Sequence, residues 1–469
     1  MKVGLRTIWF AFGCALLLPV CAFTPNPADN VKADLVVTAA PVYEPLAAMR
    51  GGERFPQGAQ LERVHAGTTE PLVAGFAATA DANVSFDAKT ILFAGKKAAG
   101  DVWQIWELTL ADGSLRQVTQ GSADAIRPFY LPGGRLVYAQ RGPRGFALVT
   151  ARLNDSTKAL EADMPAVYPL TYMQASAVPD DVLADGRILF EAGFPLGTQG
   201  TPEMFLVYAD GSGVESYRCD HGAARWGGHQ LASGDVVFTH GASLARFTSP
   251  LAHEERVAAP HAEYAGAVVE TDGGAWLVSA RAGKTERYAL KLWKPDAHAL
   301  APVLAESGMN LVEPLLLTPR TRPHHHPSAL HPWDYANLLA LDARLSRDGA
   351  LKGVPATVRM ETQDMDGRVH IAGTAPVEQD GSFFVKVPGD KPVRFAVLDA
   401  KGAVLRQERG WFWARGGEQR ICVGCHTGPE RTSENRVPAV LLRTTTPVDL
   451  TGVVPAEASQ HAAQGGQSK

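Results

Sequence analysis

The chain has 469 residues, of which 45% are hydrophobic and 20% charged, and its formal net charge is −4. A chain of this size and composition should form two or three domains with ordinary hydrophobic cores. The slightly acidic balance leaves no basic footprint for nucleic acid, so we exclude a nucleic-acid-binding protein.

The N-terminus has the features of an export signal. Lys2 and Arg6 precede an apolar core at residues 8–18, and small residues follow around Cys21. This pattern predicts a signal peptide at residues 1–22, so we expect a periplasmic or secreted protein with no transmembrane span in the mature chain. A lipoprotein anchor at Cys21 is disfavoured, because the preceding Leu-Pro-Val is a poor match to the small residues that such processing prefers.

Residues 23–69 are expected to form a leader and the first β segments. The stretch between Pro25 and Pro41 is rich in Pro, Asp and Ala and lacks helical periodicity, whereas short β-like runs begin at Gln60. We therefore expect the folded repeat to start only after this stretch.

Residues 70–318 carry a degenerate repeat of short β-rich runs that follow small turns. The turn glycines Gly134, Gly186, Gly234 and Gly274 are 52, 48 and 40 residues apart. A period of about 40 to 50 residues with four short strands per unit predicts a β-propeller with TolB- or WD40-like repeats. Five units can be traced, and segments near Pro71 or Leu315 could complete a sixth. The alternative is a β-sandwich of irregular strands.

Residues 319–350 break this pattern. Four histidines lie within eight residues: His324, His325, His326 and His331. They could bind a metal or offer a ligand to a haem iron, or they could belong to an exposed linker stiffened by prolines. A short helix is predicted over residues 333–345.

Residues 351–448 alternate apolar and polar positions between Asp-Gly turns such as Asp366-Gly367 and Asp380-Gly381. This pattern predicts a small β-sandwich that leads directly into a C-terminal c-type haem motif. Residues 449–469 are expected to be a disordered tail.

The haem motif is Cys422-Val423-Gly424-Cys425-His426. A Cys-x-x-Cys-His run predicts one covalent haem c, with thioether bonds to both cysteines and His426 as the proximal iron ligand. A zinc site would need two further ligands, and no second cysteine pair exists in the sequence. A redox dithiol would require a strand and helix after the motif, where the sequence is typical of a loop.

The sixth iron ligand must come from upstream or be absent. After His426 the sequence contains no methionine and only His461. The upstream candidates are His324, His325, His326, His331, His370, Met360 and Met365. Without such a ligand, the iron would be open to water and small molecules.

Residues just before the motif have two interpretations. Trp413 could pack on the porphyrin face or be ordinary strand core, and Arg415 and Arg420 could neutralise haem propionates or be surface arginines.

Several stretches resemble the exported propeller-plus-haem proteins related to the hydrazine synthase alpha subunit, in its propeller and middle domain. They are residues 70–97, the Trp103–Glu107 run, the hairpin at 376–382, and residues 411–426. The resemblance extends from about Glu70 to Val448 and implies the architecture and the haem. The alpha subunit in that family adds a C-terminal domain with a second c-type haem, whereas this chain has one such motif, so we do not expect hydrazine formation.

Two classes of function follow. The first is electron transfer, or redox chemistry on a small nitrogen compound or peroxide, with a redox partner protein. The alternative is a propeller-based protein-binding or sensor module in which haem is structural. Whether the protein is an enzyme stays open.

Overall fold

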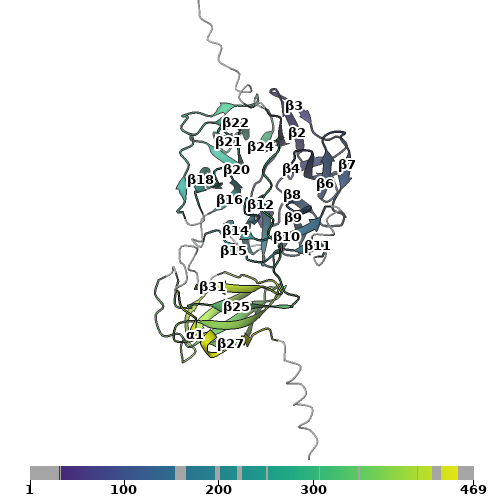
Figure 1. The fold of residues 1–469 in the computed structure, drawn as a ribbon. Helices are drawn as coiled ribbons and strands as arrows, with labels where there is room; N and C mark the ends of the chain where they lie inside the picture. Colours follow the sequence, from purple (N-terminus) through teal and green to yellow (C-terminus); the bar gives the residue numbers. More distant parts are fainter. Residues whose placement is uncertain are drawn as a thin grey trace, which may run out of the picture.

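The computed structural model describes residues 31, 33–153, 165–195, 201–218, 224–249, 252–305, 307–346, 349–408, 410–424 and 435–452 (Figure 1). The expected signal peptide and most of the expected tail lie outside these residues. Almost every described element is a strand; the helical ones are a 3-10 turn, η2 (Ala48–Arg50), and α1 (Ala439–Arg443). The mainly-β class is therefore confirmed. Within the described residues, no helix is long and apolar enough to span a lipid bilayer.

Six four-stranded antiparallel sheets form between Leu35 and Leu316 in the described chain, and they are the blades of a propeller. The first blade contains β1 (Leu35–Ala40), β2 (Gln60–His65), β3 (Thr68–Pro71) and β24 (Asn310–Leu316). The second contains β4 (Ala78–Val84), β5 (Thr90–Lys96), β6 (Gln104–Thr109) and β7 (Leu115–Gln117). The third contains β8 (Ala125–Leu131), β9 (Arg135–Gly142), β10 (Gly145–Arg152) and β11 (Val167–Pro169).

The remaining blades follow in chain order. The fourth contains β12 (Ala175–Val182), β13 (Ile188–Pro195), β14 (Glu203–Val207) and β15 (Glu215–Ser216). The fifth contains β16 (Arg225–Gln230), β17 (Val236–His240), β18 (Ser243–Phe247) and β19 (Glu255–Arg256). The sixth contains β20 (Glu263–Glu270), β21 (Trp276–Arg281), β22 (Ala289–Trp293) and β23 (Ala301–Pro302).

The ring is closed by strands from its two ends. Strand β1 pairs antiparallel with β24, so that Ala40 lies opposite Asn310. Pro71 ends β3 and Leu315 lies in β24, so both segments that could complete a sixth unit do so, in the same blade. The leader expected at residues 25–41 is wrong in its second half. Residues 35–40 form strand β1, and all six residues of this strand are buried. The propeller therefore begins near Leu35, because closing the ring requires this strand.

The innermost strand of each blade, called here its first strand, is β24 in the first blade and β4, β8, β12, β16 and β20 in the others. These strands contact one another in sequence around the ring, from β4 through β8, β12, β16 and β20 to β24. Each carries a β-bulge or register shift near its middle. At three of these bulges a charged residue adopts a positive φ: Asp81 at 57°, Arg127 at 50° and Glu313 at 56°. In β12 the corresponding residue is Asp180, between Pro179 and Asp181. Bulges re-aim side chains, and here they place charged groups at equivalent positions around the ring.

The C-terminal part is a sandwich of two four-stranded sheets with the orders β31-β25-β28-β32 and β27-β26-β29-β30. The first sheet consists of β25 (Tyr335–Ala340), β28 (Phe383–Pro388), β31 (Gln419–Cys422) and β32 (Val448–Asp449). The second consists of β26 (Thr357–Gln363), β27 (Val369–Pro376), β29 (Val393–Leu398) and β30 (Val404–Gln407). Apolar side chains from both sheets form one core, including Leu338, Val358, Met360, Val385 and Phe395.

The helix predicted over residues 333–345 is wrong. This stretch forms β25, in which Ala336, Leu338 and Ala340 are buried and the intervening residues are partly exposed. The buried positions therefore recur every second residue, as expected for a strand with one face on a core. Pairing with β28 on one side and β31 on the other outweighs the helical propensity of this Ala- and Leu-rich run.

Candidate functional site

Cys422, the first residue of the Cys-x-x-Cys-His motif, is the last residue of edge strand β31. It lies opposite Ala340 in the parallel pair with β25, and its carbonyl oxygen accepts a hydrogen bond of 2.8 Å from the Leu341 N–H. The side chain is partly buried and the thiol is free. Burial raises the pKa of this thiol, the Arg420 charge opposes the rise, and the Glu408 carboxylate adds to it. Cys425 and His426 lie outside the described residues.

The segment before the motif is packed against the propeller. The Trp413 side chain is only 1% exposed and belongs to a cluster with blade residues such as Leu131 and Val214. Glu418 Oε1 accepts a hydrogen bond of 3.2 Å from Gly213 N–H, and the Arg420 guanidinium donates to the carbonyl oxygen of Val214. The strand that carries Cys422 is thereby fixed to both domains. In Figure 1, β31 accordingly lies on the side of the sandwich that faces β14 and β15.

These contacts decide between the two interpretations of the residues before the motif. Trp413 is buried, as in the second interpretation, but it lies outside any strand and packs into a propeller cluster. Arg415 donates to the Tyr172 hydroxyl and pairs with Asp390 at 3.2 Å. Arg420 donates to carbonyl oxygens of Val214 and Trp413. Both guanidinium groups are therefore engaged by protein groups, which does not support the assignment of either to a propionate.

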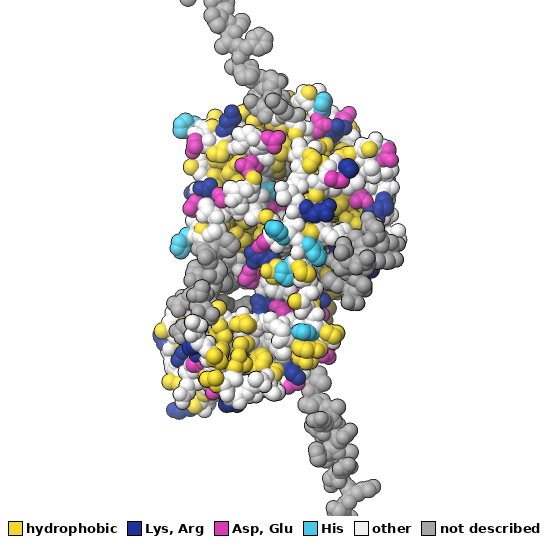
Figure 2. All heavy atoms as spheres, viewed as in Figure 1, with side chains coloured by type: hydrophobic (Ala, Val, Ile, Leu, Met, Phe, Trp, Pro, Cys, Tyr) yellow, Lys and Arg dark blue, Asp and Glu magenta, His cyan; other side chains and the backbone are white. Residues whose placement is uncertain are grey.

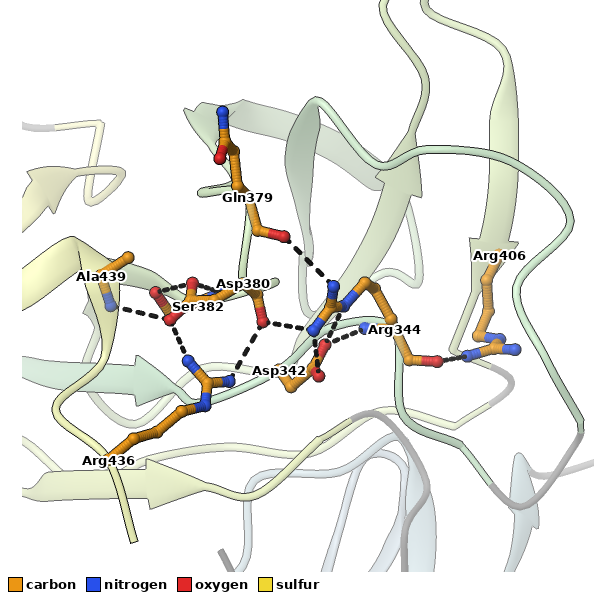
Figure 3. A network of polar contacts seen from close by, with 8 residues as sticks. All are labelled: Asp342, Arg344, Gln379, Asp380, Ser382, Arg406, Arg436 and Ala439. Carbon is orange, nitrogen blue, oxygen red and sulfur yellow. Dashed lines mark hydrogen bonds and ion pairs between the residues drawn. The ribbon is translucent and has the colours of Figure 1, made fainter. Parts of the chain in front are cut away.

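The segment after the motif is held by a polar network around Asp380 (Figure 3). One carboxylate oxygen of Asp380 accepts hydrogen bonds from Ser382, and the other accepts one of 2.8 Å from Ala439 N–H and pairs with Arg436. Burial alone would raise the pKa of Asp380, but these hydrogen bonds and the Arg436 pair outweigh it and hold the pKa well below its usual range. The described chain on both sides of residues 425–434 is thus anchored to the sandwich.

Arg344 extends this network. Its guanidinium pairs with Asp342 at 2.7 Å and donates hydrogen bonds to the carbonyl oxygens of Gln379 and Asp380, while its own carbonyl oxygen accepts one from Arg406 (Figure 3). The network therefore ties the turn after β25 to the turn that connects β27 in one sheet with β28 in the other, where a hairpin was expected at residues 376–382.

The four linker histidines follow the propeller surface and then reach the sandwich. His324 N–H donates to Ala184 O at 2.9 Å, His325 is exposed, and the His326 ring stacks on Tyr208 with centroids 4.0 Å apart. His331 stacks on Trp333 with centroids 4.4 Å apart. The structure brings His331 beside the segment that precedes the motif, because its N–H donates to Gly417 O at 3.2 Å. Only glycine fits at position 417, since a Cβ would lie 1.9 Å from His331 O and φ is +84°.

The other upstream candidates belong to the sandwich sheet that contains β26 and β27. Met360 is fully buried in the core at 0% exposure. Met365 is 65% exposed in the turn between the two strands. His370 is exposed, with Nε2 2.6 Å from Asp364 Oδ2. Among the described residues, no group of three or more His, Cys, Asp or Glu side chains is arranged to hold a metal ion.

The sequence analysis missed a charged cluster at the propeller axis. Arg54 pairs with both Asp81 and Glu313, and Arg127 pairs with Asp180 at 3.1 Å and Glu191 at 3.4 Å. Burial raises the pKa of Glu191 to about 8, and the Asp180 carboxylate adds to this rise. The available signal was an acidic residue that follows apolar residues in the innermost strand, as in Ala80-Asp81-Ala82 and Val178-Pro179-Asp180.

Part of this cluster lines a cavity of about 800 Å³ within the ring. The cavity is bounded by the C-terminal halves of the first strands and by the chain from Thr318 to Pro323, where the linker begins. On the face shown in Figure 2, histidine, acidic and basic side chains gather over the lower part of the propeller, next to the sandwich.

Three comparisons relate the chain to known proteins. Residues 342–427 match the model of the hydrazine synthase alpha subunit middle domain. No curated protein matches the sequence. Among solved structures, hydrazine synthase from Kuenenia stuttgartiensis matches with a TM-score of 0.76 at 16% identity, covering 89% of this chain and 72% of that chain. TolB from Acinetobacter baumannii matches with a TM-score of 0.44 at 13% identity, covering 60% of this chain and 66% of that chain.

The matched region contains the whole Cys422–His426 motif, and the structural match extends over propeller and sandwich alike. Residues 342–427 are therefore similar to the hydrazine synthase alpha subunit middle domain, and the chain as a whole shares the fold of the Kuenenia stuttgartiensis structure.

Proposed function

We propose that the chain is an exported c-type haem protein, periplasmic or secreted, that works in electron transfer or in redox chemistry on a small molecule. One haem would be attached through Cys422 and Cys425, with His426 as the proximal iron ligand. The observation that carries this proposal is the match of residues 342–427 to the hydrazine synthase alpha subunit middle domain, because that range includes the complete motif.

The described residues fit covalent haem attachment. Cys422 is a partly buried residue with a free thiol, and a thioether bond to the porphyrin requires a free thiol. Its main chain is fixed by β25, and the preceding residues Glu418 and Arg420 are bound to the propeller. The Asp380 network fixes the chain that re-enters after the motif. When bound, haem c supplies a reversible iron redox couple, whose potential is set by axial ligand, hydrogen bonding and burial.

The structure also bears on the sixth ligand. His331 lies beside Gly417, because its N–H donates to Gly417 O, and Gly417 precedes β31. Strand β31 runs parallel to β25, and Cys422 is the last residue of β31. Five residues of extended chain span roughly 16 Å. This register separates His331 from the Cys422 thiol, while His324 and His326 contact the propeller at Ala184 and Tyr208. We therefore propose an iron that is open to a small ligand, with the exposed His370 and Met365 as the protein alternatives.

The attachment is tested by expressing the full chain in a bacterial host that matures c-type cytochromes. The wild type should retain haem after denaturing electrophoresis and acidified-solvent extraction. Replacing Cys422 and Cys425 together by Ala should abolish this covalent haem, whereas Cys219→Ala, a cysteine outside the motif, should retain it. Covalent haem in the double variant, or its absence from the wild type, would overturn the proposal.

The class of function is tested on the same holoprotein by absorption spectra with and without carbon monoxide. Binding of carbon monoxide to the reduced iron supports small-molecule chemistry, whereas a low-spin iron that refuses it supports electron transfer. A third result is an iron that is not low-spin, does not bind carbon monoxide and cannot be reduced by a c-type donor. That result would favour the second candidate, a protein-binding or sensor module. The burial of Trp413 among propeller residues is the observation that favours that candidate, because it shows that the propeller surface can bind a protein segment.

A further inference from the structure

His229, in the innermost strand β16, lines the cavity of about 800 Å³ within the propeller ring. Its side chain is 28% exposed, and its Nδ1 lies 3.0 Å from Asp181 Oδ2. In the described part of the chain its other ring nitrogen, Nε2, makes no hydrogen bond and is not one of the buried polar atoms that lack a partner. Because Nδ1 is held by the carboxylate, Nε2 is the nitrogen that can react with a group in the cavity.

Asp181 is fixed in place by the backbone of two neighbouring blades. Its Oδ1 accepts a hydrogen bond of 2.8 Å from the Val182 N–H, and its Oδ2 accepts one of 2.9 Å from the Gln230 N–H. Burial alone would raise the pKa of Asp181, but the charge and hydrogen bond of His229 and the Gln230 N–H outweigh it and lower the pKa. An ionised carboxylate of this kind orients an imidazole and stabilises its protonated form.

The cavity distinguishes this pair from similar ones in the same chain. Other described histidines also pair with a carboxylate: His65 with Asp34, His240 with Glu254 and His370 with Asp364. Each of their side chains is more exposed than that of His229, and none of them lines the cavity. An imidazole held by a carboxylate and open to a cavity has the arrangement of a general base.

Arg320 places a cationic group beside this imidazole. It lines the same cavity, and its charge acts on the pKa of His229. Its Nη2 donates to Val84 O at 3.1 Å, and its guanidinium carbon lies 4.7 Å from the centroid of the Phe86 ring. A guanidinium has five N–H donors, and these contacts use only those of Nη2. The remaining donors can bind an oxygen atom on which negative charge develops.

The rest of the lining restricts the class of substrate. Carboxylates such as Glu270 and Asp272 line the cavity and would repel an anionic ligand. Apolar side chains such as Val84, Val182 and Leu315 line it as well. Its volume lies within the range of small-molecule sites. These properties together fit a small uncharged molecule with an apolar part.

We propose that this cavity hydrolyses a small uncharged carboxylic ester, with His229 as the general base, an activity separate from that of a haem. Nε2 takes a proton from a water molecule as the water oxygen bonds to the carbonyl carbon, and the carbonyl electron pair moves to the oxygen that Arg320 stabilises. When this pair returns, the bond from carbon to the alkoxide oxygen breaks, and the alkoxide takes the proton back from His229. Ester and water thus give a carboxylic acid and an alcohol, and the acidic lining would expel the carboxylate product.

The proposal is tested with the full-length holoprotein and phenyl acetate, by following phenol release. The wild type should show saturable hydrolysis. A general base contributes about a hundredfold or more to the rate, so His229→Gln should lower kcat/KM at least about a hundredfold. His240→Gln is the matched control, because His240 also pairs with a carboxylate but does not line the cavity, and it should leave kcat/KM unchanged.

The pH dependence tests the role of Asp181 as a positioning residue. Burial and the Arg320 charge lower the pKa of His229, but the Asp181 and Asp180 carboxylates outweigh them and raise it above its ordinary value. The base acts when it is unprotonated, so kcat/KM should rise with pH through this raised pKa. In Asp181→Asn the same rise should occur at lower pH, with a lower maximum. A structural role alone would not move the pH of the rise.

Arg320→Gln tests the stabilisation of the oxyanion. Removing one such donor typically lowers kcat about a hundredfold or more, so we expect a fall in kcat with little change in KM. Arg320 is exposed, so this variant should fold and decides the matter if His229→Gln does not.

Four results would overturn the proposal. They are the absence of saturable hydrolysis by the wild type, an unchanged kcat/KM in folded His229→Gln, an equal loss in His240→Gln, and an unchanged kcat in Arg320→Gln. A rise that stays at the wild-type pH in folded Asp181→Asn would remove Asp181 from the mechanism and with it the proposed pair.

Discussion

The indole of Trp413 lies edge-on to the ring of Tyr172, with centroids 6.2 Å apart and planes at 64°. Trp413 belongs to the segment that leads into the Cys-x-x-Cys-His motif, whereas Tyr172 belongs to the propeller. The sandwich thus contributes a side chain to a propeller core, and the two domains should be coupled in stability.

Trp413→Ala tests this coupling. Removing a buried tryptophan typically costs about 3 to 5 kcal/mol, and here the loss falls at the contact between domains. We expect the free energy of unfolding in urea to fall by this amount, and limited proteolysis to cut first between Thr318 and Ser328. Trp333→Ala is the control, because Trp333 is 37% exposed. An unchanged unfolding curve for Trp413→Ala would contradict the coupling.

Asp380→Ala should destabilise the sandwich, because it removes the acceptor for Ser382, Ala439 and Arg436. Hydrogen bonds to a charged group contribute about 1.5 to 3 kcal/mol, so we expect a loss of roughly 2 kcal/mol at pH 7. The folded pKa of Asp380 is lowered, so its stabilising contribution is present above the ordinary pKa and disappears as the pH falls. The difference between variant and wild type should therefore shrink at pH below about 4.

Asp366→Ala is the control for that measurement. Asp366 pairs with Arg368 at 3.1 Å, but the side chains are 53% and 79% exposed. Exposed pairs contribute about 0 to 1 kcal/mol, so this variant should unfold almost as the wild type does. Equal losses in the two variants would show that the network does not stabilise the sandwich.

Much of the propeller was predictable because its signals are local. The glycines used to find the repeat occupy hairpin turns with positive φ, at 77° for Gly134, 88° for Gly186, 93° for Gly234 and 70° for Gly274. Closure of the ring was not predictable in this way. It pairs Ala40 with Asn310, and no short-range pattern in a Pro- and Ala-rich stretch indicates a partner so distant in sequence.

The candidate site shows the same difference between local sequence signals and long-range contacts. The Cys-x-x-Cys-His motif can be recognised because it is contiguous, although Cys425 and His426 lie outside the described residues. The charged cluster at the propeller axis could not be recognised from the sequence. Its members come from four different blades and meet only after the ring closes: Asp81, Arg127, Asp180 and Glu313. Each looks like an ordinary polar residue in its own strand.

Glu191 should make the stability of the propeller depend on pH. Its folded pKa of about 8 exceeds the ordinary glutamate pKa of 4.5, because burial and Asp180 disfavour the charged form. Between these values the native state retains a proton that the unfolded chain releases, so the free energy of unfolding falls as the pH rises. Glu191→Gln removes this titration and should flatten the decline between pH 5 and pH 9 in urea unfolding.

Glu361→Gln is the matched control for Glu191→Gln. Glu361 is also buried, and burial tends to raise its pKa, but hydrogen bonds from Arg394 and Arg359 outweigh this and lower it. Its substitution should therefore change stability by a constant amount above about pH 5. A wild-type decline that persists unchanged in Glu191→Gln would assign the pH dependence to other groups.

The last prediction concerns the iron of the holoprotein. Replacing His324, His325, His326 and His331 together by Ala should leave its absorption spectrum unchanged, and the wild type should bind carbon monoxide when reduced. The reason is the parallel register of β25 and β31, which places His331 beside Gly417 and Cys422 at the other end of the strand.

Met360→Leu is the control for the sandwich side, because the Met360 side chain is 0% exposed in the core and cannot approach a haem without unfolding. It should lower stability slightly and leave the spectrum unchanged. Loss of an imidazole ligand converts a low-spin iron to high spin, so such a change in the fourfold variant would show that a linker histidine reaches the iron after all. A low-spin wild type that refuses carbon monoxide and is indifferent to the fourfold replacement would instead direct the next substitutions to His370 and Met365.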